Sequence, residues 1–295
     1  MDGVLLIDKA EGMTSAAAVA VVKRALRVKV GHLGTLDPFA SGLLPLVLGE
    51  GTKIAQFLNT ADKAYVGVIC FGQRTETGDR EGAVIERKAV PVDLARRCDQ
   101  VAGEFLGERR QIPPMYSALK RDGVPLYELA RRGETVEREA RAVVIHDLAL
   151  EEVDAERWRI MVRCSKGTYI RVLAEEIGEA LGTVAHLESL RRTRFGHFGI
   201  EEAATLPLTM DTARGALINP RHALAELEEE CVDLSTARQV SRGQVVALRG
   251  LSRPRQGGEA RKLVGPDGSL LAIVAADDVG HWKFARVMSA ESSAD

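Results

Sequence analysis

The sequence predicts a mixed α/β protein with a largely antiparallel sheet, followed by a small C-terminal β-barrel. Strand-like and helix-like segments alternate along most of the chain, but several strands are separated only by turns, which favours an antiparallel sheet over a doubly wound one. Near the C-terminus, short Val- and Leu-rich segments are punctuated by turn signals such as "RGLSRP" and "GPDG", which is typical of a small barrel. At 295 residues the chain is long enough to bury a large core.

The first elements are a strand and a capped helix. The segment "GVLLIDK" (3–9) predicts a buried strand, and "TSAAAVAVVKRALR" (14–27) has apolar residues at helical spacing, with Thr14 or Ser15 as its N-cap. A glycine-rich connection spans 31–51, and a short helix follows near 52–58. The connection therefore lies between two regular segments and can form a loop with close turns.

The middle of the chain predicts a strand, a helix and an irregular stretch. "KAYVGVICFG" (63–72) is a strand that ends at the polar turn "QRTETGDREG", and "PVDLARRCDQVAGEF" (91–105) suits a helix with Pro91 near its start. Proline and glycine then break the pattern over 111–132, before a short amphipathic helix.

The next elements lead to a predicted domain boundary. "RWRIMVRCSKG" alternates, so that Trp158, Ile160, Val162 and Cys164 share one face, and "TYIRVLAEEIGEALG" predicts a helix closed by Gly182. The pattern of the sequence changes between residues 220 and 233, which indicates a domain boundary. We expect a catalytic domain over 1–230, a second domain over 231–290 and a tail over 291–295.

Composition excludes several classes of protein. With 45% hydrophobic and 28% charged residues the chain is neither disordered nor fibrous. No apolar run reaches the roughly 18 residues of a membrane span, and the N-terminus lacks a signal-peptide pattern, so we expect a cytoplasmic protein. The four cysteines lack a CxxC pair, which predicts no metal site, no disulfides, and reduced thiols in the core. Neither a dinucleotide GxGxxG nor a P-loop is present.

Charge is unevenly distributed near the C-terminus, although the net charge is only −2. Seven Arg or Lys residues and one acid lie between Arg238 and Lys262, directly after the acidic stretch "ELEEECVD". Such a basic run can attract a polyanion such as RNA. The alternative is a solvated charged loop, which the sequence leaves open.

The segment "GHLGTLDPFASGLLPL" contains a single carboxylate, Asp37, among glycines and apolar residues. Pro38 disfavours helical backbone at Asp37, so the loop can present this carboxylate into a cleft. The alternative is that Asp37 only closes a turn, as aspartate often does. No Ser/His or Cys/His arrangement elsewhere offers a competing nucleophile.

The longer stretch "GHLGTLDPFASGLLPLVLGEGTK" resembles the signature of the bacterial tRNA pseudouridine-55 synthase family. Four further segments resemble that family in the same order: "LLIDKAEGMTS", "KAYVGVICFG", "IPPMYSALKRDGVPLYELARRG", and "CSKGTYIRVLAEEIGEALG" with "HLESLRRTRFGHF". Two positions depart from the pattern, Ala10 where the family usually has proline and Leu33 where a smaller or more polar residue is common.

The resemblance implies an isomerase that converts the T-loop uridine at position 55 of tRNA to pseudouridine without a cofactor. It implies that Asp37 is the catalytic aspartate, that Arg171 pairs with it, and that Tyr65 stacks on the target base and moves a proton. It also implies a pseudouridine synthase catalytic domain and a PUA-like RNA-binding domain. The partner is then the T-arm of tRNA, and we expect a monomer with no obligatory protein partner and no membrane contact.

The resemblance also suggests residues that bind the substrate. His32 matches a histidine that enters the T-loop, and Tyr169 a second wall of the base pocket, while Tyr116 and Lys120 shape the cleft. Phosphate contacts are expected from basic side chains, because RNA affinity comes largely from the backbone; these are Lys9, Lys23, Arg191, Arg192 and Arg194. Each of these roles has an alternative. The aromatic residues could pack in the core and the histidine could be structural. Arg171 could form a surface ion pair, and the other cations could lie on solvated faces.

Two other functions fit the same scaffold. The first is a non-catalytic RNA-binding protein or tRNA-folding chaperone, and the intact set of Asp37, Tyr65 and Arg171 argues against it. The second is a guide-RNA-directed pseudouridine synthase, which the long middle segment from Gln73 to Gly107 and the bacterial-type C-terminal segment disfavour.

Overall fold

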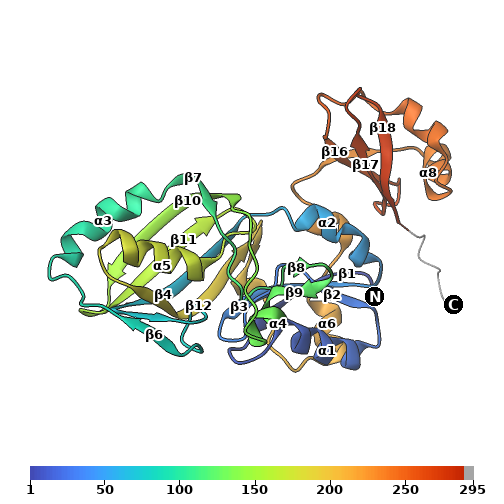
Figure 1. The fold of residues 1–295 in the computed structure, drawn as a ribbon. Coiled ribbons are helices and arrows are strands. Elements are labelled where there is room, and N and C mark those ends of the chain that lie inside the picture. The colour runs from blue at the N-terminus through green and yellow to red at the C-terminus, as the bar shows by residue number, and fades with distance from the viewer. Residues whose placement is uncertain (289–295) are drawn as a thin grey trace.

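The computed structural model describes residues 1–288 as an elongated body that carries a smaller C-terminal sheet (Figure 1). The predicted tail, 291–295, lies outside the described residues. One ten-stranded sheet runs through the body in the order β14-β1-β3-β12-β4-β11-β10-β7, with β2 paired to β3 and β13 to β12. The strand pairings of this sheet are antiparallel except that of β12 with β3, so the prediction of a largely antiparallel sheet is confirmed.

The strands of this sheet follow the sequence pattern. Trp158, Ile160, Val162 and Cys164 on β11 are all buried, as their alternation predicts. The ten strands are β1 (Gly3–Lys9), β2 (Val30–His32), β3 (Ser41–Leu48), β4 (Lys63–Phe71), β7 (Gly107–Gln111), β10 (Arg141–Glu152), β11 (Arg157–Cys164), β12 (Ala185–Phe195), β13 (Phe198–Gly199) and β14 (Leu217–Ile218).

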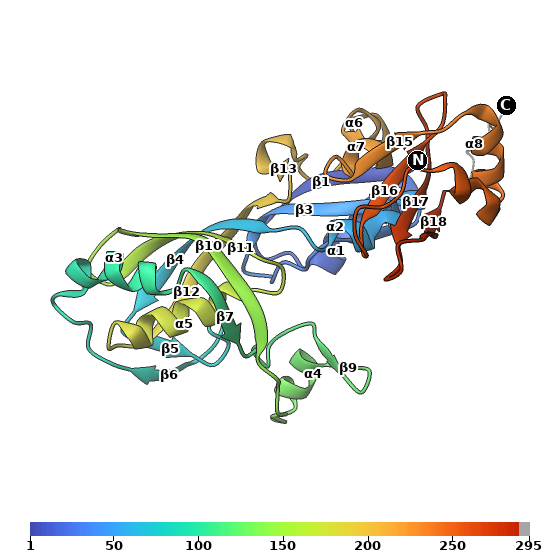
Figure 2. The same cartoon turned by 90° about the horizontal axis from the view of Figure 1, so that it is seen from above.

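The longer helices form where the sequence predicts them. In α1 (Ser15–Leu26) the Thr14 side chain accepts from Ala17 N, which makes Thr14 the N-cap. Helices α3 (Leu94–Glu104) and α5 (Ile170–Ala180) lie on one side of the sheet (Figure 2) and bury Leu94, Val101, Leu173 and Ile177 in its main core. Gly182 adopts a φ of 85° just after α5, as a glycine that closes a helix does.

Short elements connect these parts. They are η1 (Gly49–Ile54), α2 (Ala55–Leu58), β5 (Gln73–Thr75), β6 (Val84–Arg87), β8 (Lys120–Arg121), β9 (Val124–Pro125), α4 (Leu126–Arg131), η2 (Ile200–Glu202), α6 (Met210–Gly215) and α7 (Pro220–Ala223). In the part of the chain that the structure describes, no helix is long and apolar enough to cross a membrane.

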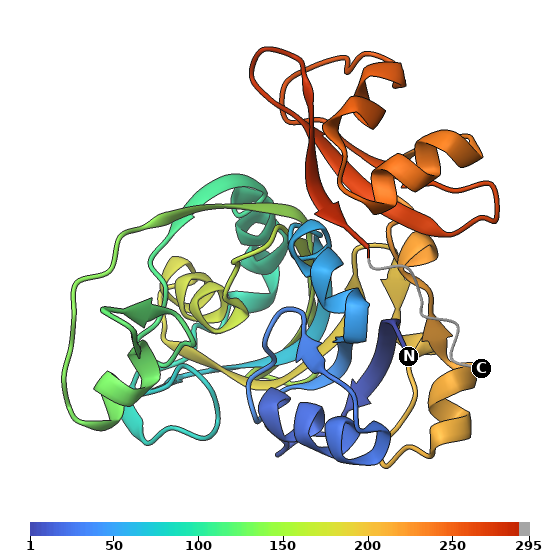
Figure 3. The same ribbon diagram turned by 90° about the vertical axis from the view of Figure 1, so that its right-hand side faces the viewer.

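The C-terminal unit is a four-stranded sheet in the linear order β15-β16-β17-β18 (Figure 3). Its elements are β15 (Glu228–Cys231), α8 (Leu234–Ser241), η3 (Val245–Gly250), β16 (Ala260–Val264), β17 (Leu270–Ala276) and β18 (Trp282–Val287). Within residues 1–288 no pairing of β15 with β18 closes this sheet into the predicted barrel. Ile273 and Met288 pack in one apolar cluster with Val4, Leu6 and Phe198 of the body, so the two units share a core.

The basic run at the C-terminus is partly neutralised by the acidic stretch before it. Strands β15 and β16 pair in parallel, which places Glu230 2.6 Å from Arg261 and Glu229 3.5 Å from Lys262. Both cations are buried, so two of the seven basic residues are unavailable to a polyanion and the prediction is wrong for them. The cysteines are free, but Cys231 is exposed, which corrects the expectation that all four lie in the core.

Gly42 allows the close approach of β3 to β12. Its φ is 101°, and a Cβ at this position would lie 2.3 Å from Arg192 O and 2.8 Å from Arg192 N. By contrast, a Cβ on Gly103 in α3 would meet no atom within 4 Å.

We expect Gly42→Ala to lower the free energy of unfolding by at least about 2 kcal/mol, because the added methyl collides with backbone and the positive φ is strained. Gly103→Ala is the matched control and should raise stability by about 0.5–1 kcal/mol. Urea unfolding of both variants measures the difference, and equal stabilities would contradict this account of the β3/β12 junction.

Candidate active site

A cavity of about 340 Å³ opens where β4, β12, the start of α5 and the loop after β2 meet. Its volume lies within the range of about 300–1,000 Å³ that is usual for ligand sites. Its wall includes Asp37, Tyr65, Tyr169, Arg171 and Arg192, which come from four separate parts of the chain. The fold therefore brings all three predicted catalytic residues into one cavity.

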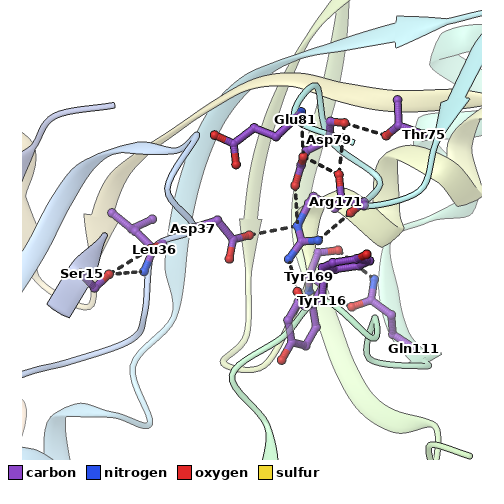
Figure 4. Close-up of polar contacts among 11 residues, drawn as sticks. Ser15, Leu36, Asp37, Thr75, Asp79, Glu81, Gln111, Tyr116, Tyr169 and Arg171 are labelled. Carbon is purple, nitrogen blue, oxygen red and sulfur yellow. Dashed lines mark hydrogen bonds and ion pairs between the residues drawn. The ribbon is translucent and has the colours of Figure 1, made fainter. Parts of the chain in front are cut away.

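Asp37 lies on a loop that hydrogen bonds from α1 hold in place. The Ser15 hydroxyl accepts from Leu36 N and donates to Leu36 O, both at 2.9 Å (Figure 4). Ala40 N donates to Asp37 O across the turn at 3.1 Å. The loop thus does form a turn, but the Asp37 side chain remains 36% exposed and points toward Arg171.

The buried side chain of Arg171 forms an ion pair with Asp37. Its side chain is only 4% exposed, and its Nε donates to Asp37 Oδ2 at 2.9 Å. The two terminal nitrogens donate to backbone carbonyls, Nη1 to Thr77 at 2.6 Å and Nη2 to Tyr116 at 2.7 Å. Since three donors are held at once, the guanidinium is rigid and fixes the direction of the Asp37 carboxylate. A surface ion pair, the alternative for Arg171, is inconsistent with this burial.

Asp79 is a second carboxylate beside Arg171 that the sequence did not reveal. Its Oδ2 lies 3.5 Å from Arg171 Nε, and its side chain is 6% exposed. Its Oδ1 accepts from the Thr77 hydroxyl at 2.6 Å and from Glu81 N at 3.0 Å. The only sequence signal was an aspartate in the polar turn "TETGDREG", which by itself predicts no more than a turn.

Two tyrosines contribute aromatic surface to the cavity. Tyr65 on β4 is 9% exposed, and burial raises the pKa of its phenol, while the adjacent Arg192 opposes that rise. Tyr169 precedes α5, where its backbone N donates to Gln111 Oε1 at 2.8 Å, and burial raises its pKa as well. Both rings line the cavity. Their roles toward a base remain predictions.

Two residues predicted to contact phosphate lie inside the protein. Lys9 is 0% exposed, and its ammonium donates to Met13 O at 2.6 Å and to Ala10 O at 3.0 Å. Burial lowers the pKa of Lys9 to about 8. Arg192 is 1% exposed. Neither side chain reaches the surface, so the prediction of a phosphate contact is wrong for both residues. The alternative prediction, a solvated face, is also wrong for them.

The other predicted substrate contacts lie outside the cavity wall. Lys23 on α1 and Arg194 on β12 are exposed, and Arg191 forms an ion pair with Asp8 at 2.6 Å. His32 on β2 is half-buried, and burial together with the charge of Arg192 lowers its pKa. Among residues 1–288 no group of three or more His, Cys, Asp or Glu residues is placed to hold a metal ion.

Comparisons with known proteins identify the family of this chain. Residues 23–170 match the TruB family pseudouridylate synthase N-terminal domain, and residues 171–218 match the tRNA pseudouridylate synthase B C-terminal domain. The chain belongs to the TruB family of pseudouridylate synthases. The family resemblance predicted from five ordered segments is therefore confirmed.

Curated relatives and solved structures extend the match. A protein named tRNA pseudouridine synthase B from Cupriavidus metallidurans is 45% identical over 92% of this chain and 89% of its own. Another of that name, from Burkholderia pseudomallei, is 48% identical over 94% of each chain. The crystal structure of a Cbf5-Nop10-Gar1 complex contains a chain with a TM-score of 0.70 and 26% identity, over 97% of this chain and 84% of the other.

Lys9 gives this TruB family member a pH-dependent stability. Its pKa of about 8 in the folded state is below the value of 10.5 for an unburied lysine, so the unfolded chain binds more protons between these pH values. Stability contributed through Lys9 therefore rises with pH. At about 1.4 kcal/mol per pH unit the gain is at most about 3.5 kcal/mol.

We expect the difference in unfolding free energy between the wild type and Lys9→Met to shift in favour of the wild type as the pH rises from about 8 to 10.5. Urea unfolding at several pH values measures it. A difference that stays constant with pH would mean that Lys9 is charged in the fold and that its burial costs less than the geometry implies.

Proposed function

We propose that this protein isomerises the uridine at position 55 in the T-loop of tRNA to pseudouridine, with Asp37 as the essential carboxylate. The observation that carries the proposal is the Asp37–Arg171 ion pair at 2.9 Å, which presents one carboxylate into a cavity lined by Tyr65 and Tyr169. The names of the curated relatives support tRNA as the substrate.

The reaction breaks the bond from uracil N1 to ribose C1′, turns the base and joins C5 to C1′. It is an isomerisation, so it needs neither a redox partner nor an external donor. It does need a group that bonds covalently to the nucleoside or stabilises the charge that develops on the sugar, and one fixed carboxylate suffices. Arg171, itself contacted by Asp79, holds that carboxylate in place, and Tyr65 offers a stacking surface to the extruded base.

RNA binding is assigned to the exposed cations and to the C-terminal unit as a PUA-like domain. Arg238, Arg242, Arg249 and Arg253 are exposed on this unit, and Lys23 and Arg194 are exposed on the body. Because β15 pairs within the C-terminal sheet, we place the domain boundary just before Glu228, close to the boundary at residue 230 indicated by the sequence. A monomer acting on the T-arm without a protein partner is the simplest assembly.

The two competing functions make different predictions for the purified protein. A binding protein or chaperone would leave uridine unchanged, and a guide-directed enzyme would need an added guide RNA. Tritium release from C5-labelled uridine in a T-loop transcript, measured without any addition, separates the proposed function from both alternatives, neither of which releases tritium under these conditions.

We expect Asp37→Asn to abolish turnover while tRNA affinity stays within a few fold, because affinity comes from phosphates and shape and the chemistry depends on one carboxylate. Tritium release measures turnover and filter binding measures affinity. Near-parental turnover in this variant would refute the assignment of Asp37.

Replacing Arg238, Arg242, Arg249 and Arg253 together by Gln should raise KM for full-length tRNA and leave kcat unchanged. The dependence of affinity on salt should flatten, because each lost phosphate contact removes about 0.7–0.9 from the log–log slope. A variant of Arg157 and Arg159, which form surface ion pairs with Asp154 and Glu151, controls for the loss of positive charge. An unchanged slope in the fourfold variant would exclude these residues from the interface.

A further inference from the structure

Arg192 is a buried guanidinium in the cavity wall, directly opposite Tyr65. The pairing of β12 with β4 places the two residues across from each other, and both line the cavity. Arg192 Nε donates to Leu43 O at 2.7 Å, and Nη2 donates to Gly34 O at 2.9 Å. Gly34 and Leu43 flank the loop that carries Asp37, so one side chain contacts both parts of the site.

The charge of Arg192 is not balanced by any acid. Over residues 1–288 no carboxylate lies within ion-pair distance of its guanidinium, whose side-chain neighbours include the neutral Tyr65 phenol and the Phe195 ring, 5.4 Å away at its centroid. The two other buried arginines differ in this respect. Arg171 contacts Asp37 and Asp79, and Arg261 contacts Glu228, Glu230 and Glu259.

An unpaired buried charge lowers stability by several kcal/mol, because the guanidinium loses its hydration without gaining a carboxylate. Two backbone carbonyls could be satisfied by a neutral amide donor. Holding the loop therefore does not require a positive charge at this position. The charge lies beside Tyr65, the surface on which the base is expected to stack.

We propose that Arg192 supplies the positive charge that stabilises the uracil ring when its bond to the sugar breaks. This inference rests on the proposed function. As the C1′–N1 bond breaks, its electron pair stays on N1 and is shared with O2 and O4, while positive charge forms at C1′ beside Asp37. C5 then uses that electron pair to bond to C1′, the C5 proton leaves, and N1 takes up a proton, so that atoms and electrons balance.

The charges in the cavity assign different roles to its basic residues. Arg171 is already neutralised by two carboxylates, and Asp37 faces the cation at the sugar. Lys63 is a second cation in the wall, 4.6 Å above the Phe195 ring, but burial and the charge of Arg192 lower its pKa to about 8. Arg192 is thus the group that offers unbalanced positive charge to an anionic base.

The test compares Arg192→Gln, which removes the charge, with Arg192→Lys, which keeps it. Single-turnover tritium release at saturating enzyme gives a rate constant, which reports chemistry, and an amplitude, which reports the active fraction. We expect the rate constant to fall at least about 100-fold in the Gln variant, as when a donor to a developing anion is removed, and at most about 10-fold in the Lys variant. The Kd for tRNA should stay within a few fold in both.

Arg97→Gln is the matched control. Arg97 also donates to two backbone carbonyls, Leu181 O and Ala180 O, both at 3.0 Å, but it does not line the cavity. A substitution that only weakens the fold lowers the amplitude and leaves the rate constant unchanged, and this is the result expected for Arg97→Gln. If Arg192→Gln folds poorly, the rate constant of its active fraction still tests the proposal. The rate constant of Arg192→Lys tests it as well.

Equal losses of rate constant in the Gln and Lys variants would overturn the proposal, because charge would then not matter. So would a Gln variant that loses only amplitude or tRNA affinity. These results differ from a failure of the proposed function, in which the wild-type protein itself releases no tritium from the T-loop transcript.

Discussion

The ion pair between Asp37 and Arg171 is the interaction on which the rest of the site depends. It joins a loop near the N-terminus to the first turn of α5, 134 residues later, across the middle of the sheet. The loop is held by Ser15 of α1 on one side and by Arg192 on the other, and the guanidinium is held by two backbone carbonyls. A carboxylate placed in this way needs no reorganisation when a substrate arrives.

Tertiary contacts, and not the local sequence, determine which buried charges in this protein have a partner of opposite charge. Two carboxylates surround Arg171, whereas Arg192 has none, although both guanidinium groups are buried and line one cavity. At the C-terminus the opposite holds, since Arg261 and Lys262 are paired with the acidic strand beside them. A buried charge that has a carboxylate partner is neutralised within the fold, while a buried charge without one can interact with a ligand.

Local patterns predicted the elements but not the partners of their polar residues. The helix after Thr14 and the buried face of β11 follow from periodicity within one segment, and both are confirmed. The position of Asp79 depends on a turn folding back onto α5, and nothing within "TETGDREG" encodes that contact. Likewise a basic residue in a strand has the same sequence signal whether it is exposed or buried, so the sequence predicts phosphate contacts for Lys9 and Arg192 although both are buried.

The shared core between the two units has a consequence for substrate binding. Ile273 and Met288 of the C-terminal unit pack with Val4 and Leu6 of β1, the strand that pairs with β3 just beyond the Asp37 loop. Arg286 and Lys53 add polar contacts across the same junction. A packed apolar junction resists rotation, so the exposed arginines of the C-terminal unit keep a fixed distance from Asp37. The proposed phosphate contacts far from the cavity would then determine which nucleotide of a folded RNA reaches the carboxylate, without reading its sequence.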